Sequence, residues 1–230
     1  MTIKKTLSGS MLKMIAIVSM AIDHTTYFVL RHEPALRETL CSIGNTEVTG
    51  YFLLRCVGRL AFPIFAFLIV EGFLHTRNQQ RYGRDLLILA IISEIPWILL
   101  HDGTFHLRGH NVMFTLLFGY CALCAIDRLS ERIWRQAGAV ATWFGITLIF
   151  APDYDIAGFA FILMLYTTRR TPVIQAVIGS TMLMSTWIAG LAFIPINMYN
   201  GERGFIKGTI AKYCFYAFYP LHLMMIYLMR

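Results

Sequence analysis

Long runs of apolar residues fill most of the chain, and most of them are about as long as a membrane-spanning helix. Such a helix needs roughly 20 mainly apolar residues. We count about eight runs, at residues 12–30, 52–75, 84–100, 111–127, 133–151, 156–168, 172–194 and 212–229. The runs are continuous rather than alternating, which is typical of helices that satisfy their own backbone groups in lipid. The pattern predicts an all-α, polytopic transmembrane bundle in a single domain, residues 1–230.

The composition supports this prediction and changes the meaning of the charge. Hydrophobic residues make up 57% of the chain and charged residues only 14%, whereas soluble domains carry about 25% charged residues. The net charge of +7 is explained by Lys and Arg in short loops that fix membrane topology, so no nucleic-acid partner is expected. With the N-terminus in the cytoplasm, the short inner loops hold most of these residues. The pattern therefore predicts that both termini are cytoplasmic.

Six ionisable side chains interrupt the apolar runs. They are Asp23, His24, Arg59, Glu71, Glu94 and His222. An unpaired charge inside the bilayer costs several kcal/mol. We therefore expect these side chains to converge on an interior cavity.

His24 is the candidate general base among them. A carboxylate that holds an imidazole fixes its tautomer and stabilises its protonated form. Asp23 is adjacent in sequence, so on a helix the two side chains point about 100° apart. Either Asp23 pairs with another helix, for instance through Arg59, or the acid that orients His24 is Glu71 or Glu94. The alternative is that these charges are structural ion pairs.

Three further features bear on binding. Asn111, at the outer end of its run, and His222, in the last run, are candidate substrate-binding residues, although His222 is equally explained as a packed histidine. Arg77, Arg81 and Arg84 form a basic segment that is suited to phosphate, although a topogenic loop has the same composition.

Metal chemistry is not expected. His101, His106 and His110 lie in an irregular loop without convincing ligand spacing. Cys121 and Cys124 lie on an apolar run without a second pair, and we interpret them as packing residues.

Five segments resemble the TraX family. They are LKMIAIVSMAIDH (12–24), GRLAFPIFAFLIVEGFLHTRN (58–78), HNVMFTLLFGY (110–120), DYDIAGFAFILML (153–165) and FYAFYPLHLMMIYL (215–228). That family is named for the integral membrane protein that acetylates the N-terminus of conjugative pilin. A looser likeness links Lys13 and His24, which are separated by ten intervening residues, and the pair Arg81 and Arg84 to the broader membrane acyltransferases.

The resemblance implies acetyl transfer from cytoplasmic acetyl-CoA to an acceptor amine or hydroxyl, in a pilin N-terminus or a cell-surface glycan, by a multi-pass protein of the bacterial cytoplasmic membrane. Four basic residues would then hold the phosphates of acetyl-CoA: Lys13, Arg77, Arg81 and Arg84. His24 would act as general base or carry the acetyl group, and Asp23 or Glu71 would stabilise its imidazolium. Arg59 or Asn111 would stabilise the oxyanion.

Two alternatives come from other classes of protein. A proton-coupled transporter would use the buried acids and His24 as a proton relay, although the chain lacks the paired halves typical of transporters. A non-catalytic pilus or envelope assembly factor would use the same charges as partner contacts.

Overall fold

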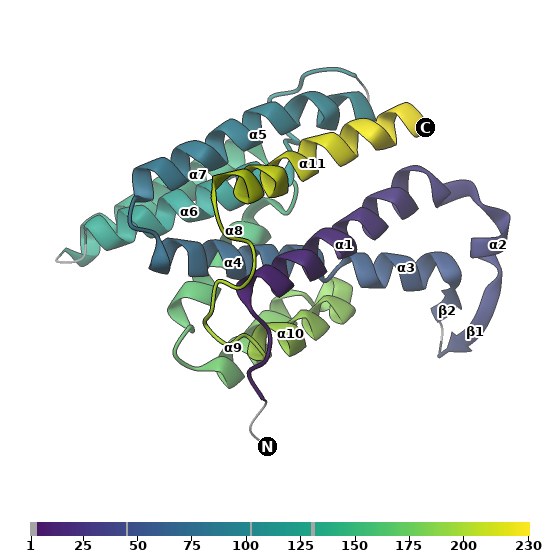
Figure 1. Cartoon of the computed structure of the whole chain (residues 1–230), viewed down its shortest axis with the longest axis horizontal. Coiled ribbons are helices and arrows are strands. Elements are labelled where there is room, and N and C mark those ends of the chain that lie inside the picture. The colour runs from purple at the N-terminus through teal and green to yellow at the C-terminus, as the bar shows by residue number, and fades with distance from the viewer. Residues whose placement is uncertain (1–3, 45, 102, 130–131) are drawn as a thin grey trace.

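The computed structural model describes residues 4–44, 46–101, 103–129 and 132–230, and it is mostly helical (Figure 1). The elements in chain order are α1 (Gly9–Phe28), η1 (Leu30–His32), α2 (Pro34–Arg37), β1 (Thr39–Ile43), β2 (Thr46–Thr49), α3 (Gly50–Gly58), α4 (Ala61–His75), α5 (Gln79–His101), α6 (Val112–Arg128), α7 (Ile133–Phe150), α8 (Asp155–Thr167), α9 (Pro172–Met182), η2 (Met184–Ala192), α10 (Phe193–Asn197) and α11 (Thr209–Met229). The all-α prediction is confirmed. The small antiparallel hairpin of β1 and β2 is an addition that the apolar pattern did not indicate.

Helices α1, α5 and α11 run parallel to one another. The start of α11 lies beside the start of α5, where Lys212 Nζ is 2.6 Å from Asp85 Oδ2. Its end lies beside the end of α5, where Arg230 donates to the Leu100 carbonyl. The start of α1 is bonded to the segment just before α11, since Gly9 N donates to the Glu202 carbonyl at 2.8 Å. The start of α1 and the end of α11 therefore lie at opposite ends of the bundle, whereas the apolar pattern predicted both termini on one side of the membrane.

The difference arises at the run 172–194, which does not cross the bundle. It forms α9 and then turns back through η2 and α10, with Gly179 against the Phe193 ring and Gly190 against Ser180. A side chain at either glycine would prevent this close approach. Because the chain returns to the end from which it started, Met198 lies beside the N-terminal segment, and its carbonyl accepts from Leu7 N at 2.9 Å.

The number of spans is likewise not confirmed. Within the described residues, one helical stretch, Gly50–His75, is long and apolar enough to cross a membrane by length and composition. The apolar helices Asp155–Thr167, Pro172–Met182 and Ile188–Asn197 are shorter. Even the qualifying stretch is interrupted, because residues 59 and 60 separate α3 from α4.

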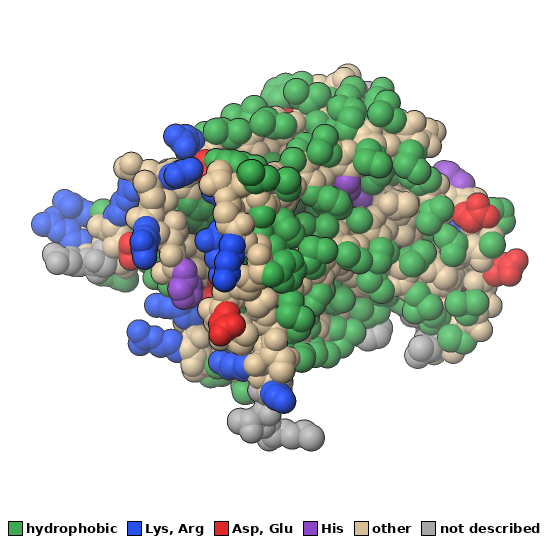
Figure 2. Space-filling model, in the orientation of Figure 1, with side chains coloured by type: hydrophobic (Ala, Val, Ile, Leu, Met, Phe, Trp, Pro, Cys, Tyr) green, Lys and Arg blue, Asp and Glu red, His purple; other side chains and the backbone are tan. Residues whose placement is uncertain are grey.

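Charged side chains gather at the ends of the molecule, with a broad apolar surface between them (Figure 2). Most of the Lys and Arg side chains in this view lie toward one end, and acidic side chains appear at the other. We call the end that holds Lys13, Arg84, Arg203 and Lys212 the basic end. The end of α4, which carries His75, belongs to it as well, because only residues 76–78 separate it from the start of α5, where Asp85 pairs with Lys212.

Candidate functional site

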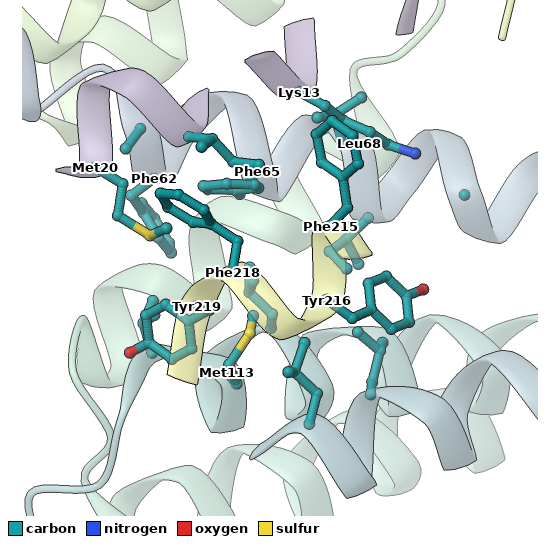
Figure 3. Close-up of a pocket in the computed structure, with 18 of the residues that line it drawn as sticks. Lys13, Met20, Phe62, Phe65, Leu68, Met113, Phe215, Tyr216, Phe218 and Tyr219 are labelled. Carbon is teal, nitrogen blue, oxygen red and sulfur yellow. The ribbon is translucent and has the colours of Figure 1, made fainter. Parts of the chain in front are cut away.

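A cavity of about 790 Å³ runs along the inside of the bundle. Lys13, Arg203 and Lys212 line it at the basic end, and His101 and Asp153 line it toward the opposite end. Its middle is walled by apolar and aromatic side chains from α1, α4, α6 and α11, shown in Figure 3. A long flexible ligand that is charged at one end would match this lining.

His24 lines the cavity and is held by His222 of α11. Its Nδ1 lies 2.7 Å from His222 Nε2, and His222 Nδ1 lies 2.9 Å from the carbonyl oxygen of Phe218. A carbonyl can only accept, so His222 carries its proton on Nδ1 and offers the bare Nε2 to His24. His24 must then donate through Nδ1–H. The contact therefore leaves Nε2 of a neutral His24 with a free lone pair, which is the requirement for a general base.

None of the acids expected to orient His24 does so. Asp23 forms an ion pair with Arg55, at 2.7 Å between Oδ1 and Nη1. Arg55 is also stacked over the Tyr27 ring, 4.9 Å from its centroid. The sequence analysis named Arg59 as the possible partner of Asp23, whereas the actual partner, Arg55, lies about one helical turn earlier. The sequence signal for His222 was present, since it is a histidine in an apolar run, but its pairing with His24 depends on the parallel packing of α1 and α11.

Gly58 explains how Asp23 comes so close to α3. A Cβ on Gly58 would lie 2.3 Å from both Cβ and Oδ1 of Asp23. Only glycine permits this approach, which gives a steric reason for the glycine at position 58, directly before Arg59. The helix ends here, and Arg59 follows with its side chain against the cavity.

Arg59 meets the turn between α7 and α8, which sequence reasoning did not identify as part of the site. Its guanidinium hydrogen-bonds Tyr154 and acts electrostatically on Asp153. Burial raises the pKa of Asp153 to about 6, and the nearby Arg59 and His101 limit the rise. The accessible surface of Asp153 opens into the cavity.

The backbone of this turn is strained. Ala151, Tyr154 and Asp155 have φ values of 40°, 58° and 41°, in the left-handed region that is unfavourable for residues with a side chain. Such strain is concentrated at functional sites. The signal in the sequence was the segment DYD, which lies within one of the segments quoted above for the family resemblance.

Glu71 lies at the basic end, away from His24. Its carboxylate is 3.6 Å from His75 Nδ1, and it hydrogen-bonds Tyr199. The expected phosphate-binding residues Arg77, Arg81 and Arg84 are exposed near the turn between α4 and α5 and do not line the cavity. Of the four predicted phosphate ligands, Lys13 alone lines it.

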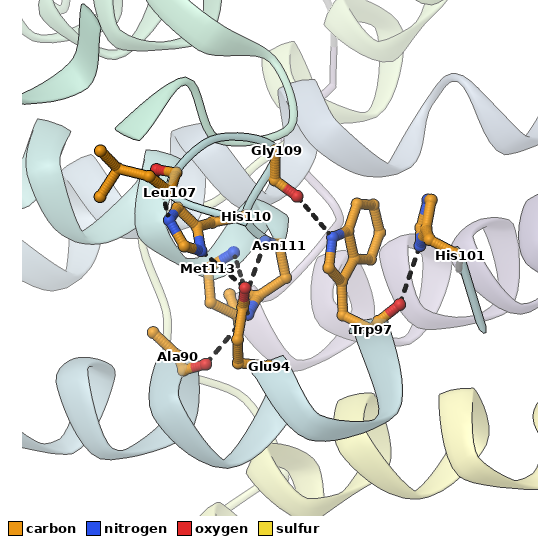
Figure 4. A network of polar contacts seen from close by, with 9 residues as sticks. All are labelled: Ala90, Glu94, Trp97, His101, Leu107, Gly109, His110, Asn111 and Met113. Atoms are coloured by element: carbon orange, nitrogen blue, oxygen red, sulfur yellow. Dashed lines mark hydrogen bonds and ion pairs between the residues drawn. The ribbon is translucent and has the colours of Figure 1, made fainter. Parts of the chain in front are cut away.

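Asn111 has a structural role in this geometry (Figure 4). Its side chain is fully buried, caps α6 by accepting from Met113 N at 2.9 Å, and donates to the Ala90 carbonyl and to Glu94 Oε2. Glu94 also lies 2.6 Å from His110 Nδ1. This network joins α5 to α6, and Asn111 does not line the cavity.

The loop histidines have separate partners. His110 pairs with Glu94, His101 bonds the Trp97 carbonyl, and His106 bonds Thr104. Among the residues that the structure describes, no group of three or more His, Cys, Asp or Glu is arranged to hold a metal ion.

Comparisons with known proteins identify the family. The family model described as TraX protein matches residues 8–230. The chain is 31% identical to the "Probable fimbrial assembly protein FimC, serogroup H1" of Dichelobacter nodosus, over 94% of this chain and 93% of that protein. No solved structure matches the chain. The match includes all of the residues that line the cavity, from Gly9 to Tyr219. Because the family model matches nearly the whole chain, the chain belongs to the TraX family.

Proposed function

We propose that this protein is a membrane acetyltransferase that moves an acetyl group from acetyl-CoA to an amine or hydroxyl of an acceptor on the other side of the bilayer. One observation carries the proposal. A histidine with a free ring nitrogen, His24, lies in a cavity that is basic at one end and extends toward the other. This arrangement suits a donor and an acceptor that approach the same base from opposite sides.

The surface supports a position in the membrane. Large apolar side chains point outward from the middle of the long helices, for example Ile91 and Ile95 on α5 and Leu221 and Met225 on α11, each more than half exposed. Such a surface needs a cover, and lipid is the cover we propose. The helices would make seven crossings, with α9, η2 and α10 as a re-entrant hairpin.

The distribution of charge supports an orientation with the basic end in the cytoplasm. Besides Lys13, thirteen cations then lie inside, at positions 4, 5, 77, 81, 84, 128, 132, 135, 169, 170, 203, 207 and 212. Five lie outside, at positions 31, 37, 55, 108 and 230. This bias agrees with the positive-inside rule more strongly than the topology expected from sequence did. We therefore propose the bacterial cytoplasmic membrane as the location, with the C-terminus outside.

Dimensions along α1 suit the donor. Lys13 and His24 are eleven residues apart, which corresponds to about 16 Å along a helix axis. An extended pantetheine arm has a length of this order. The cavity wall beside this arm would include Phe65, Leu68 and Phe215, which line the cavity together with Lys13 (Figure 3).

The chemistry assigned to His24 is general-base catalysis. Nε2 takes the proton of the acceptor N–H or O–H as the acceptor attacks the thioester carbonyl carbon. The resulting oxyanion collapses, the C–S bond breaks, and the thiolate leaves and is protonated by the imidazolium. His222 holds the His24 ring in the required tautomer throughout. We propose Arg59 as the group that stabilises the oxyanion, because it is a cation that faces the cavity.

The acceptor we propose is a pilus subunit or another surface component. The relative named as a probable fimbrial assembly protein supports a pilus-related role. That name fits a non-catalytic assembly factor equally well, and the experiment below separates the two.

The test is acetyl transfer or acetyl-CoA hydrolysis by purified protein in detergent. We expect turnover by the wild type and a loss of about 10²-fold or more in His24→Ala, in line with removal of a general base. His32→Ala is the matched control, because His32 is exposed and does not line this cavity. Wild-type protein that folds but never turns over acetyl-CoA, together with full biological rescue by His24→Ala, would favour the assembly factor.

A further inference from the structure

The segment before α11 is fastened to the start of α1. Ser10 N and Ser10 Oγ both donate to the Arg203 carbonyl, at 3.0 and 2.7 Å, and Ile206 N donates back to Ser10 Oγ at 2.8 Å. Gly204, with φ +85°, has no room for a side chain, since a Cβ would lie 2.3 Å from Ser8 Oγ. These contacts fix the backbone on either side of the Arg203 side chain at the mouth of the cavity.

Arg203 is not alone at this mouth. Lys13 and Lys212 line the same cavity, and both Arg203 and Lys212 act electrostatically on Lys13. Only Lys212 has an ion-pair partner among the described residues, namely Asp85, which is itself shared with Arg84. The nearby carboxylates are Asp85, which is shared with Arg84, and Glu71, which lines the cavity beside His75. Four cations at this end, including Arg84, therefore leave an excess of positive charge that an anion would neutralise.

The helix N-terminus is not available for this task. The amides of Gly9 and Ser10 already donate to the carbonyls of Glu202 and Arg203. The amide of Met11 donates to Ser8 Oγ, which caps the helix. An anion at this mouth would therefore be held by side chains. Lysine and arginine side chains near one another are suited to the several oxygens of a phosphorylated group.

We propose that Lys13, Arg203 and Lys212 form the binding site for the phosphate-bearing end of the donor ligand, in place of the exposed arginines at 77, 81 and 84. The proposal rests on the proposed function for the identity of the ligand as a coenzyme A thioester. Its site, however, is defined by the three cations that line the cavity. The apolar wall that continues toward His24 would hold the part of the ligand without phosphate.

The test measures binding of coenzyme A itself, which has no acetyl group to transfer, and of pantetheine, which lacks the nucleotide phosphates. In Arg203→Ala and Lys13→Ala we expect coenzyme A affinity to fall roughly tenfold or more, as for loss of a charge-assisted contact. Pantetheine affinity should not change. Lys207→Ala is the matched control, because it removes one positive charge from the same segment at a position that does not line the cavity. It should bind coenzyme A as the wild type does.

Two results would overturn the inference. One is an equal loss in Lys207→Ala, which would indicate a general effect of charge. The other is a loss of coenzyme A affinity that occurs only in Arg81→Ala, which would indicate that the exposed segment with Arg77, Arg81 and Arg84 binds the phosphates. The outcome is distinguishable from that of the proposed function. If coenzyme A binding depends on Arg203 but no acetyl transfer is found, the proposed enzymatic function is refuted and the proposed phosphate site stands. If acetyl transfer depends on His24 but coenzyme A binding does not depend on Arg203, the phosphate site is refuted and the enzymatic function stands.

Discussion

His24 and His222 are 198 residues apart in the chain, yet their rings lie edge to edge in nearly parallel planes, with 2.7 Å between Nδ1 of the first and Nε2 of the second. The contact joins the first long helix to the last. It exists because α11 runs parallel to α1, with both starting at the basic end. The proton arrangement of the pair follows from the Phe218 carbonyl, which makes Nδ1 of His222 the donor.

The first prediction concerns this pair. His222→Phe keeps an aromatic ring of similar shape but removes the acceptor, so His24 loses the contact that fixes its tautomer. We expect kcat for acetyl transfer to fall roughly 10²-fold, since loss of the correct tautomer removes most of the benefit of a base. The KM for acetyl-CoA should change little. Steady-state kinetics in detergent measure both parameters.

A purely structural role for His222 would give a different result. The protein would then unfold at lower temperature while the remaining folded fraction kept its normal kcat. Leu221→Ala on the same helix serves as the control, because Leu221 is 61% exposed and points away from the pair. Normal kcat in His222→Phe would remove His222 from the mechanism.

Much of the helical architecture could be predicted from the apolar runs, because each long helix leaves a continuous hydrophobic stretch. The sequence also indicated that Asp23 and His24 belong to a polar site, because buried charges need partners. The partners themselves were not. Asp23 takes Arg55 rather than Arg59, and this choice depends on the close approach that Gly58 allows.

The expected topology differs from the structure at one place, for a physical reason. The run at 172–194 has the length of a span, and hydrophobicity does not distinguish a crossing from a hairpin that returns. Without that reversal, the expected topology put Arg203 and Lys212 on the side opposite the start of α1, whereas the structure places them beside Lys13. The sequence therefore did not indicate that these cations meet at the cavity mouth. The arginines at 77, 81 and 84 were the remaining candidates for phosphate binding.

The second prediction tests the packing at Gly58. In Gly58→Ala the new methyl group would overlap the Asp23 side chain, so we expect a loss of stability of about 1–3 kcal/mol, as for overpacked cores. Displacement of Asp23 should also lower acetyl transfer, because His24 is its neighbour on α1. Thermal unfolding in detergent measures the first effect.

Gly145→Ala provides the comparison for this substitution. Gly145 lies inside α7 with no atom within 4 Å of the added Cβ. Alanine is favoured over glycine in a helix by roughly 0.5–1 kcal/mol, so this variant should be as stable as the wild type or more so. A destabilisation of equal size in both variants would contradict the steric account.

The third prediction separates a structural Asn111 from a substrate-binding one. Asn111→Ala removes the cap of α6 and two hydrogen bonds that join it to α5, and it leaves Glu94 with fewer donors. Loss of a cap alone costs about 0.5–2 kcal/mol, and the full loss should exceed it. We expect lower thermal stability with an unchanged KM for donor and acceptor. A raised KM at unchanged stability would restore the substrate-binding interpretation.

The fourth prediction concerns pH. The pKa of Asp153 is raised by burial from its ordinary value of 3.8 to about 6, so the folded protein favours the protonated carboxyl. This contribution to stability is fully present below the ordinary pKa and is lost as pH rises through about 6. Asp153→Asn should therefore show a flatter dependence of stability on pH over that range. Thermal unfolding at a series of pH values measures this dependence, and an unchanged dependence in Asp153→Asn would contradict the role assigned to this carboxyl.

The fifth prediction tests the direction of α11. If the basic end faces the cytoplasm, a cysteine that replaces Arg230 lies outside, whereas one that replaces Lys4 lies inside. In a background without the five native cysteines, a membrane-impermeant thiol reagent should label Arg230→Cys in intact cells and Lys4→Cys only after permeabilisation. Protection of both positions would mean that α11 ends on the cytoplasmic side. That result would contradict the parallel arrangement of α1 and α11, and with it the contact between His24 and His222 on which the proposed base depends.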